Sequence, residues 1–390
     1  MTAYRPRHVD ELVELVADAA ATGEKLELRG GGSKAAIGAD RNVAIVDMRG
    51  FAGIVDYDPS ELVLTVGAGT PLAEVEALVA SKGQMLAFEP YDQGTLLSSR
   101  SGQATIGGVV AAGVAGSGRL TAGSARDHLL GFTAVSGRGE RFVGGGKVVK
   151  NVTGYDLPKL VSASWGRLVA LTEITLKVLP RPRVTNTMAI EGLGHHAAQA
   201  AMACAMGSSA EIGAAAHLPA TADRAALTLF RVQGFAPSVA ARCSVLPDIV
   251  GGHGQAKLLP GDEAAEHWRE VREVRPLGDA ETLWKISLPP TGGPLLVDRL
   301  APLGAGWLFD WAGGLVWLAF EGDAALVRQA AEAAGGHAML VRAPDAIRNA
   351  VPFQHPRSPG MMALEARVRR AFDPNAVFET GRFLDMAHAH

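Results

Sequence analysis

The sequence predicts an α+β fold that is divided between two domains. Its 390 residues exceed the roughly 100–200 residues of one ordinary domain. Short strand-like and helical runs follow one another without a fixed-period repeat. The 47 glycines exceed the roughly 27 expected from an average share of about 7%, and they gather in the first half. We therefore expect backbone geometry, rather than side chains, to carry the function of that half.

The first elements follow from hydrophobic periodicity. Apolar side chains at helical spacing predict a helix over residues 9–21, and alternation predicts a strand over 25–29. A helix that begins at Pro71 and runs through Ser81 is predicted next, because proline favours the first helical position. Between these elements, short β-rich runs predict strands at 43–48, 53–56 and 62–66.

The first domain is predicted to end at the Pro-Arg-Pro step of residues 180–182. Strand-like runs precede this step at 129–135, 141–143 and 168–179. Beyond it, residues 183–343 predict a second α+β domain, and residues 344–390 form a C-terminal segment with an amphipathic helix at 360–372. The second domain is expected to contain strands such as 227–232, 282–288, 315–320 and 337–341, and helices near 195–206, 262–274 and 323–334.

Composition narrows the class of protein. Apolar residues make up 48% and charged residues 20%, with a net charge of -3, which excludes disorder and argues against nucleic acid as the main ligand. The charged N-terminus has no apolar stretch behind it, so no signal peptide and a cytoplasmic chain are expected. Cys204 and Cys243 form no CxxC pair, so an iron-sulfur cluster would have to come from a partner.

Residues 30–35, Gly-Gly-Gly-Ser-Lys-Ala, follow a predicted strand and fit the dinucleotide fingerprint G-x-G-x-x-A. The next strand begins at about residue 43, which leaves too little chain for a Rossmann crossover helix. The backbone N–H groups of such a loop can still form a nest for a pyrophosphate, with Ser33 as a further donor and Lys34 as an exposed charge. A plain turn is the alternative.

Residues 105–118 contain five glycines among small residues, which predicts neither a good helix nor a good strand. This backbone and the polar stretch 150–157 are expected to wrap around a ligand, although two ordinary loops are the alternative. Other site motifs are missing. Residues 144–147 lack the flanking residues of a P-loop, no G-x-S-x-G elbow occurs, and the histidines have no metal-ligand spacing, with only His195 and His196 adjacent.

Taken in order, seven segments resemble the FAD-binding fold of the vanillyl-alcohol oxidase and p-cresol methylhydroxylase (PCMH) superfamily. They are 29–34, 67–69, 105–118, Gly131, 150–157, 164–173 and 372–374. The run Lys-Asn-Val-Thr-Gly-Tyr-Asp-Leu at 150–157 and a short cap look most like the E subunits of bacterial glycolate oxidase, also called glycolate dehydrogenase. The resemblance implies a PCMH-type FAD-binding domain of two subdomains at 1–182, a smaller α+β cap at 183–343, and a segment at 344–390 that returns to the FAD domain.

The resemblance also implies site residues. Those expected to bind FAD are Arg29, Gly30, Gly31, Gly32, Ser33, Lys34, Pro90, Thr105, Ile106, Gly107, Gly108, Gly113, Gly118, Arg119, Gly154, Tyr155 and Val169. Relatives with covalent flavin attach it through His or Cys, and neither occurs at 29–34 or 101–119, so non-covalent FAD is expected. At 162–168, Ser-Ala-Ser-Trp-Gly-Arg-Leu replaces a common Gly-Ser-Glu-Gly-Thr-Leu-Gly. No catalytic residue and no metal ligand is assigned.

The implied function is that of an FAD subunit of a multisubunit dehydrogenase. It would oxidise glycolate or D-lactate to the 2-oxo acid, with a catalytic flavoprotein D subunit and an iron-sulfur F subunit as partners. Any membrane contact would be peripheral and through those partners. One alternative is a self-sufficient dehydrogenase, in which Arg342 or Arg348 binds the substrate carboxylate and His355 is the base. The other is a scaffold subunit that has lost the cofactor.

Overall fold

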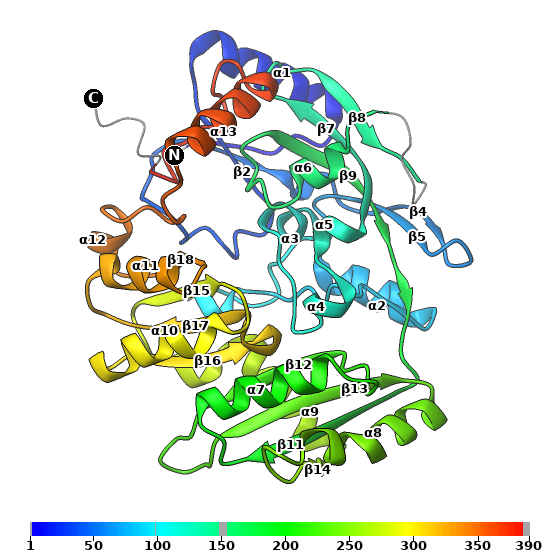
Figure 1. The fold of residues 1–390 in the computed structure, drawn as a ribbon. Helices are drawn as coiled ribbons and strands as arrows, with labels where there is room; N and C mark the ends of the chain where they lie inside the picture. The colour runs from blue at the N-terminus through cyan, green and yellow to red at the C-terminus, as the bar shows by residue number, and fades with distance from the viewer. Residues whose placement is uncertain (1, 98, 148–153, 385–390) are drawn as a thin grey trace. The chain divides into compact units, whose positions relative to one another are not determined.

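The computed structural model describes residues 2–97, 99–147 and 154–384, and the chain forms two compact units (Figure 1). The first unit comprises residues 1–116, 123–181 and 356–390, and the second comprises 117–122 and 182–355. The C-terminal segment thus joins the first unit from residue 356, whereas the sequence placed its start at 344. The reason is local, because the Leu340 N–H donates to the Phe353 carbonyl and so pairs residues 344–355 with the second unit.

The first unit contains two larger sheets. A parallel sheet of three strands has the order β1-β3-β2, and an antiparallel sheet of five has the order β4-β5-β9-β7-β8. A short pair, β6 with β10, completes the strands described in this unit. The strands are β1 Ala3–Tyr4, β2 Leu26–Arg29, β3 Ala44–Asp47, β4 Ile54–Asp58, β5 Val63–Gly67, β6 Gln84–Met85, β7 Leu129–Ser136, β8 Arg141–Gly145, β9 Val169–Lys177 and β10 Leu179–Pro180.

Helices cover both sheets of the first unit. Helix α1 buries Leu12 and Val16 in a core that it shares with the parallel sheet, where Leu26 and Val46 lie. The apolar residues at helical spacing, which predicted this helix from the sequence, therefore form its buried face. The helices are α1 Val9–Thr22, α2 Leu72–Ser81, α3 Ile106–Ala112, α5 Ala125–His128, α6 Leu157–Val161 and α13 Pro359–Phe372, with short 3-10 turns η1 Met48–Gly50 and η2 Thr95–Leu97.

Helix α3 corrects one expectation. Part of the glycine-rich stretch 105–118 was predicted to be a poor helix, yet residues 106–112 are helical. The Thr105 hydroxyl accepts from the Gly108 N–H at the start, and Gly113 ends the helix in the left-handed region at φ 64°. Gly107 lets the helix lie directly against Ala68, since a Cβ there would be 2.6 Å from the Ala68 carbonyl oxygen. Close packing outweighs the low helix propensity of glycine.

The second unit is built on one eight-stranded sheet in which every strand pair is antiparallel. The strand order is β14-β11-β13-β12-β16-β17-β15-β18. These strands are β11 Val184–Glu191, β12 Ala214–Leu218, β13 Leu227–Gly234, β14 Lys257–Leu258, β15 Leu283–Ser287, β16 Gly306–Asp310, β17 Leu315–Ala319 and β18 His337–Arg342. Both units therefore combine helices with antiparallel sheet, which confirms the α+β class.

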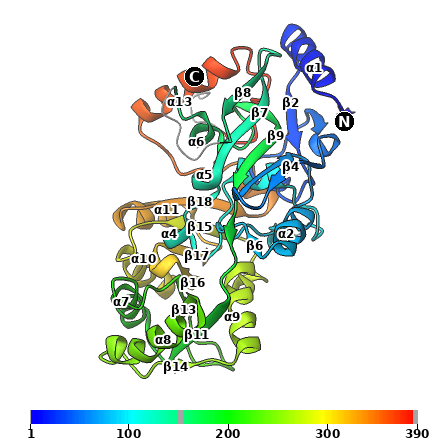
Figure 2. The ribbon, with the colours of Figure 1, turned by 90° about the vertical axis from the view of Figure 1, so that its right-hand side faces the viewer.

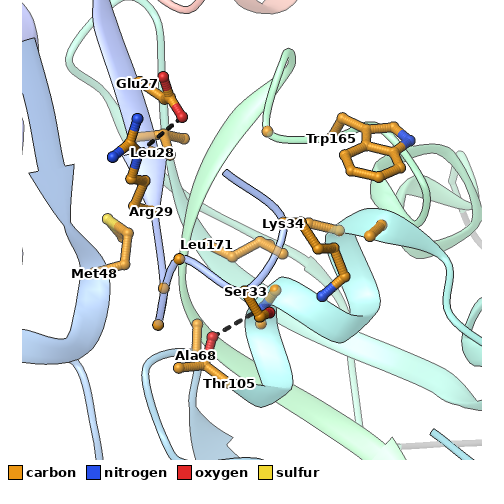
Figure 3. A pocket seen from close by; sticks show the side chains of 18 of the residues that line it. Glu27, Leu28, Arg29, Ser33, Lys34, Met48, Ala68, Thr105, Trp165 and Leu171 are labelled. Carbon is orange, nitrogen blue, oxygen red and sulfur yellow. Dashed lines mark hydrogen bonds and ion pairs between the residues drawn. The ribbon is translucent and has the colours of Figure 1, made fainter. Parts of the chain in front are cut away.

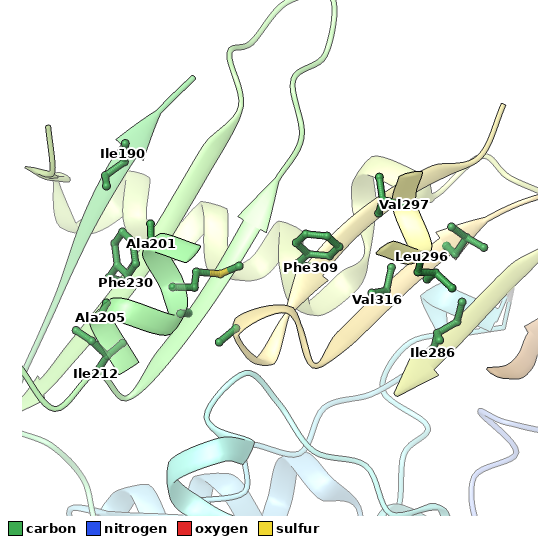
Figure 4. Packing of buried hydrophobic residues seen from close by; sticks show 14 of the residues in the cluster. Ile190, Ala201, Ala205, Ile212, Phe230, Ile286, Leu296, Val297, Phe309 and Val316 are labelled. Atoms are coloured by element: carbon green, nitrogen blue, oxygen red, sulfur yellow. The ribbon is translucent and has the colours of Figure 1, made fainter. Parts of the chain in front are cut away.

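Four long helices, α7, α8, α10 and α11, pack on one face of this sheet, and α9 lies on the other (Figure 2). Buried side chains such as Phe230, Phe309 and Val316 meet the first group (Figure 4). On β11, Met188 faces this core, whereas its neighbour Thr187 accepts a hydrogen bond from the Trp268 indole of α9 at 3.0 Å. The helices are α4 Arg119–Ala122, α7 His195–Met206, α8 Ala236–Val250, α9 Gly261–Glu273, α10 Gly292–Leu300, α11 Ala324–Ala333 and α12 Asp345–Arg348, with 3-10 turns η3 Arg275–Leu277, η4 Ala301–Leu303 and η5 Trp311–Gly313.

None of the helices in the described ranges combines the length and apolar composition of a membrane span.

Candidate functional site

A concave site in the first unit is formed around residues 30–35, which we call the glycine loop. Figure 3 shows it between strand β2, the start of α3 and the loop that carries Trp165. We call this site the glycine-loop groove. Its lining is Glu27, Leu28, Arg29, Gly30, Gly31, Gly32, Ser33, Lys34, Ala35, Met48, Ala68, Thr105, Gly107, Gly108, Ala111, Ala112, Trp165, Gly166, Val169, Leu171 and Arg382.

The glycine loop presents backbone donors to the groove. The N–H groups of residues 31–34 form no hydrogen bond to any other described residue. Gly32 has φ 78°, a conformation that favours glycine, and the space where its Cβ would stand is open. Successive N–H groups that converge beside a left-handed residue form a concave anion-binding nest. A row of lined-up donors without protein partners is what a phosphate ligand requires.

Gly30 and Gly31 serve a different purpose from Gly32. A Cβ on Gly31 would lie 1.5 Å from the carbonyl oxygen of Gln103, and one on Gly30 would lie 2.1 Å from the Thr105 hydroxyl. These two glycines therefore let the loop pack against the chain that leads into α3. A backbone contact within the protein therefore accounts for glycine at position 31.

The C-terminal segment holds the glycine loop in place. Arg382 donates from Nε to the Ile37 carbonyl at 2.9 Å and from its terminal nitrogen to the Lys34 carbonyl. Its guanidinium also lies over the Trp165 ring, 5.4 Å from the centroid. Gly38 lies so close that a Cβ there would be 2.3 Å from the Arg382 carbonyl oxygen. The loop is thus fixed by a residue about 350 positions away.

A buried carboxylate organises the positive charge at the edge of the groove. Glu27 accepts two hydrogen bonds from Arg41, both at 2.6 Å, and one from Arg29 at 2.8 Å. Burial alone would raise the pKa of Glu27, but the hydrogen bonds from Arg41 and Arg29 outweigh it and hold the pKa at about 2. The cations Arg29, Arg41, Arg382 and Lys34 outnumber the carboxylates Glu27 and Asp92 that act on them, so the local charge favours an anionic ligand.

Lys34 is not the exposed charge that the sequence suggested. Its side chain is half-buried, and desolvation lowers the pKa of its ammonium to about 8, against a smaller opposing effect of Asp92. The expectation of a fully solvated lysine was wrong, because the loop folds back and places the side chain inside the groove (Figure 3). An ammonium that has lost water gains more from a phosphate than a solvated one does.

The loop 162–166 supplies an aromatic wall. Ala163, Trp165 and Gly166 all have positive φ, at 61°, 58° and 74°. Two backbone bonds to α3 maintain this conformation, from the Ala163 N–H to the Val110 carbonyl at 3.0 Å and from the Trp165 N–H to the Ala111 carbonyl at 2.8 Å. Non-glycine residues held in this region cluster at ligand sites. The Trp165 ring can cover a flat ligand, and its own edge contacts Phe383.

The structure brings many of the predicted site residues together. Those that line the glycine-loop groove are Arg29, Gly30, Gly31, Gly32, Ser33, Lys34, Thr105, Gly107, Gly108 and Val169. Ile106 is buried in the core beside it, Gly113 ends α3, and Pro90, Gly154 and Tyr155 are not part of its lining. Gly118 and Arg119 belong to the second unit, and residues 150–153 lie outside the described residues.

Sequence reasoning missed other residues of the lining. Met48 ends a predicted strand and no motif marks it, whereas Ala68 and Leu171 lie in two segments of the resemblance, 67–69 and 164–173, but were assigned no role in the site. Trp165 and Gly166 were detectable in the sequence, since they lie in residues 162–168, where this chain departs from the common Gly-Ser-Glu-Gly-Thr-Leu-Gly pattern. Arg382 carried no such signal, because only the folded chain brings it to the glycine loop.

The second unit holds a separate polar cluster on the sheet face opposite the four-helix core. Lys285 pairs with Trp317 in the β15–β17 register, and its ammonium lies 5.3 Å from the centroid of Trp311. Arg119 lies over the same Trp311 ring at 4.7 Å. Asp310 is buried, and its carboxylate accepts from the Ser117 hydroxyl at 2.9 Å. We call Arg119, Lys285, Asp310, Trp311 and Trp317 the Lys285 cluster.

Desolvation and the neighbouring charge of Arg119 lower the pKa of Lys285 to about 8, and the carboxylate of Asp310 opposes this shift. Lys285 and Arg119 thus place two cations beside Asp310 and the tryptophan rings, and Lys285 is largely removed from water. Cations in such a setting can hold a small anion such as a carboxylate.

The residues proposed for a self-sufficient dehydrogenase have other partners. Arg342 donates to the carbonyls of Leu277, Gly278 and Ala280, and Arg348 pairs with Asp345 at 2.6 Å. The His355 Nε2 lies 3.0 Å from Glu332. These contacts tie each of the three side chains to neighbouring residues of the second unit.

Two other histidines of the second unit, His217 and His267, also have local partners. His217 is buried, its Nδ1 lies 2.9 Å from the Thr228 hydroxyl, and burial lowers its pKa to about 4. His267 contacts Glu270 at 3.3 Å on the same helix. Neither of these two histidines is assigned a catalytic role.

The glycine-loop groove fits a flavin dinucleotide. Its N–H nest, its excess of cations and its aromatic wall are the groups that a diphosphate and a flat ring system require. Residues 2–144 match the family described as FAD binding domain. Over 378 residues, the chain is 35% identical to the glycolate oxidase subunit GlcE of Escherichia coli (strain K12), covering 95% of this chain and 96% of that protein.

The chain belongs to the GlcE family of glycolate oxidase subunits. A second relative is the glycolate oxidase subunit GlcD of Bacillus subtilis (strain 168), 33% identical over 135 residues, which are 35% of this chain and 27% of that protein. The resemblance expected from the sequence is confirmed, as are FAD as the cofactor and an FAD-dependent oxidoreductase as the class of enzyme.

A solved structure supports the fold assignment. The crystal structure of p-cresol methylhydroxylase with bound substrate aligns with a TM-score of 0.71 at 14% sequence identity, over 97% of this chain and 88% of that one. At this identity the likeness concerns the fold alone. It confirms the PCMH-type fold that the sequence predicted for this GlcE-family chain.

Proposed function

We propose that this GlcE-family chain binds FAD non-covalently in the glycine-loop groove and acts as one subunit of a 2-hydroxy-acid dehydrogenase. The substrate class is glycolate or D-lactate, which is oxidised to the 2-oxo acid. The groove carries this proposal, because it combines free backbone donors, cationic side chains and an aromatic wall. No histidine or cysteine is among the described residues that line it, which supports a non-covalent cofactor.

The residues of the groove divide the binding of the cofactor between them. The glycine loop and Lys34 would hold the diphosphate, and Trp165 would cover an apolar part of the ligand. Bound FAD supplies the capacity to accept the two electrons of alcohol oxidation. Glu27 keeps Arg29 and Arg41 ordered at the groove edge, so positive charge is already in place when the ligand arrives.

The Lys285 cluster is the proposed site for the substrate carboxylate. Lys285 and Arg119 provide the positive charge, and Asp310 fixes the surrounding backbone by accepting from the Trp311 N–H at 2.8 Å. The tryptophan rings exclude water from these charges, which strengthens their attraction for an anion. This assignment replaces the roles considered for Arg342, Arg348 and His355, which bind backbone carbonyls or neighbouring carboxylates instead.

Partner subunits are proposed as the route by which electrons leave. Cys204 is exposed and Cys243 is half-buried, and they lie on different helices as free thiols. Two thiols cannot build a four-cysteine cluster. We infer a flavoprotein D-type partner and an iron-sulfur F-type partner, with any membrane contact made through them.

The test compares the purified chain with the assembled subunits. The chain alone is expected to be yellow, to release intact FAD on denaturation, and to oxidise glycolate slowly in a dye-linked assay. Co-expression with D-type and F-type subunits is expected to raise the rate per flavin at least tenfold. Equal rates would favour the self-sufficient dehydrogenase, and a colourless folded chain that takes up no added FAD would favour the scaffold.

A further inference from the structure

The second unit contains two imidazoles and a carboxylate that converge away from the Lys285 cluster. His195 and His196 are the first two residues of α7, and Asp298 lies on α10. The His195 Nε2 is 2.7 Å from one Asp298 oxygen, and the His196 Nε2 is 2.8 Å from the other. We call these three residues the His195 cluster.

Core packing brings the two helices together. Val297, next to Asp298 in α10, is buried in the same core as Ala201 and Met202 of α7. The two helices therefore lie side by side, and Asp298 reaches the start of α7 although it is about 100 positions further along the chain. Gly194 caps α7 with extended backbone, so the helix begins with the two histidines rather than before them.

The ligand atoms of the His195 cluster suit a divalent transition metal. One nitrogen of each imidazole and one carboxylate oxygen all lie within 4.8 Å of one another. Neutral imidazole nitrogen and carboxylate oxygen are ordinary Zn²⁺ ligands, with bonds of about 2.0–2.2 Å. Binding one ion at those bond lengths requires the three atoms to adjust their positions, and the side chains of His196 and Asp298 are exposed enough to do so. Mg²⁺ and Ca²⁺ prefer oxygen ligands and fit two imidazoles poorly.

The surroundings leave the cluster accessible. His196 is 59% exposed and Asp298 is 45% exposed at the side chain, while His195 is more enclosed. His195 also lines a groove with His217, Trp307 and Gly194. Its ring packs edge-on against Trp307, with centroids 5.7 Å apart, which limits the orientations of this imidazole. One ligand is therefore held by packing, and the other two can adjust.

We propose that His195, His196 and Asp298 form a zinc-type metal site that joins α7 to α10 in the second unit. Three protein ligands leave a fourth position for water or for an anion that enters from the groove. The sequence assigned no metal ligands, because the adjacent histidines lack a spacing motif and Asp298 is remote in the chain. The site is independent of the FAD groove and of the proposed dehydrogenase activity.

The test measures Zn²⁺ binding by the full chain, using equilibrium dialysis with elemental analysis. His388→Ala and His390→Ala are introduced in all samples, because terminal histidines can bind metal on their own. We expect one Zn²⁺ per chain and an increase in thermal stability on binding. His196→Ala and Asp298→Asn should each weaken Zn²⁺ at least tenfold, since changes to groups that only support a metal ligand already cost about 10–100-fold.

His253→Ala, at another histidine of the same unit, is the matched control and should bind Zn²⁺ as tightly as the parent chain. His196 is largely solvent-exposed, so its variant is expected to fold, and the melting temperature without metal checks this. The proposal is overturned if the parent chain binds no stoichiometric Zn²⁺. It is also overturned if folded His196→Ala and Asp298→Asn variants bind Zn²⁺ like the control.

Discussion

The two units of this chain build their polar sites in different ways. In the first unit, the glycine loop places backbone donors in one groove within five consecutive residues, 30–34. In the second unit, the Lys285 cluster draws side chains from residues 119, 285 and 310, and the His195 cluster draws on two helices. A site made of consecutive backbone has a local sequence signature, whereas a site made of distant side chains has none.

The difference also concerns how each site tolerates change. At Gly30 and Gly31 the glycine loop packs so closely against its neighbours that an added methyl group has no room. The clusters of the second unit depend on charge, and a neutral side chain of similar volume can occupy the same space. Four predictions test this contrast, from the largest expected effect to the smallest.

Gly31→Val should abolish FAD binding and destabilise the first unit. The new Cβ would lie 1.5 Å from the Gln103 carbonyl oxygen, which is backbone and cannot move aside. We expect a loss of about 3 kcal/mol or more in the free energy of unfolding, measured by urea denaturation, and no flavin absorbance after purification. Gly146→Val is the control, because no atom lies within 4 Å of its added Cβ. A stable Gly31→Val protein with normal flavin content would show that the loop packs differently.

Arg382→Ala should weaken FAD without unfolding the chain. It removes the guanidinium that binds the Ile37 and Lys34 carbonyls and that lies over Trp165. Leaving these carbonyls without a donor should cost about 2 kcal/mol of stability and roughly tenfold in FAD affinity, measured by flavin fluorescence titration. Arg370→Ala, an exposed arginine of α13, should change neither quantity. Equal effects of the two variants would show that Arg382 does not hold the glycine loop in the conformation that binds FAD.

Lys285→Met should leave FAD content normal and reduce glycolate oxidation by the assembled subunits. The variant keeps the volume of the side chain and removes the charge proposed to bind the carboxylate. We expect kcat/KM to fall roughly 10–100-fold, as for the loss of one hydrogen bond to a charged group. Lys257→Met, at an exposed lysine of β14, is the control. An unchanged kcat/KM in Lys285→Met would show that the Lys285 cluster does not bind the substrate. The assignment of the FAD site would not be affected.

Lys34 should make FAD affinity and stability respond to pH in opposite directions. Its pKa is about 8 in the free chain, below its usual 10.5, and a bound diphosphate would raise it. FAD affinity should therefore fall by roughly threefold to tenfold between about pH 7 and pH 9.

The unfolded chain retains the Lys34 proton between about pH 8 and pH 10.5, whereas the folded free chain has lost it. The Lys34 contribution to stability therefore rises with pH across this window. Lys34→Met should flatten the pH dependence of both FAD affinity and stability. The difference between the pH profiles of the variant and the parent chain is the part that Lys34 contributes, apart from other titrating groups. Identical pH profiles in the two proteins would mean that Lys34 stays solvated.

Local patterns predicted much of the fold. Alternation and helical spacing located β2, β3, β5, α1 and α2 to within a few residues, because each of these elements buries one periodic face. The failure at α3 has a specific cause. Glycine is unfavourable in an isolated helix, but Gly107 permits contact with Ala68 that no larger residue allows. Propensity describes a free segment, and α3 exists only in contact with its neighbour.

The sequence by itself predicted an anion-binding loop at residues 30–34, and seven ordered segments resembled a PCMH-type FAD fold, which the comparisons confirm. The loop prediction rests on consecutive residues, whose backbone geometry is set by short-range sterics. Only the tertiary structure decided that Arg382 holds that loop, that Lys34 is desolvated, and that Asp298 meets His195 and His196. Such contacts join residues about 100 to 350 positions apart, and their partners are selected by how helices and sheets pack. Packing depends on the shapes of both elements together, and no single segment of the sequence contains that information.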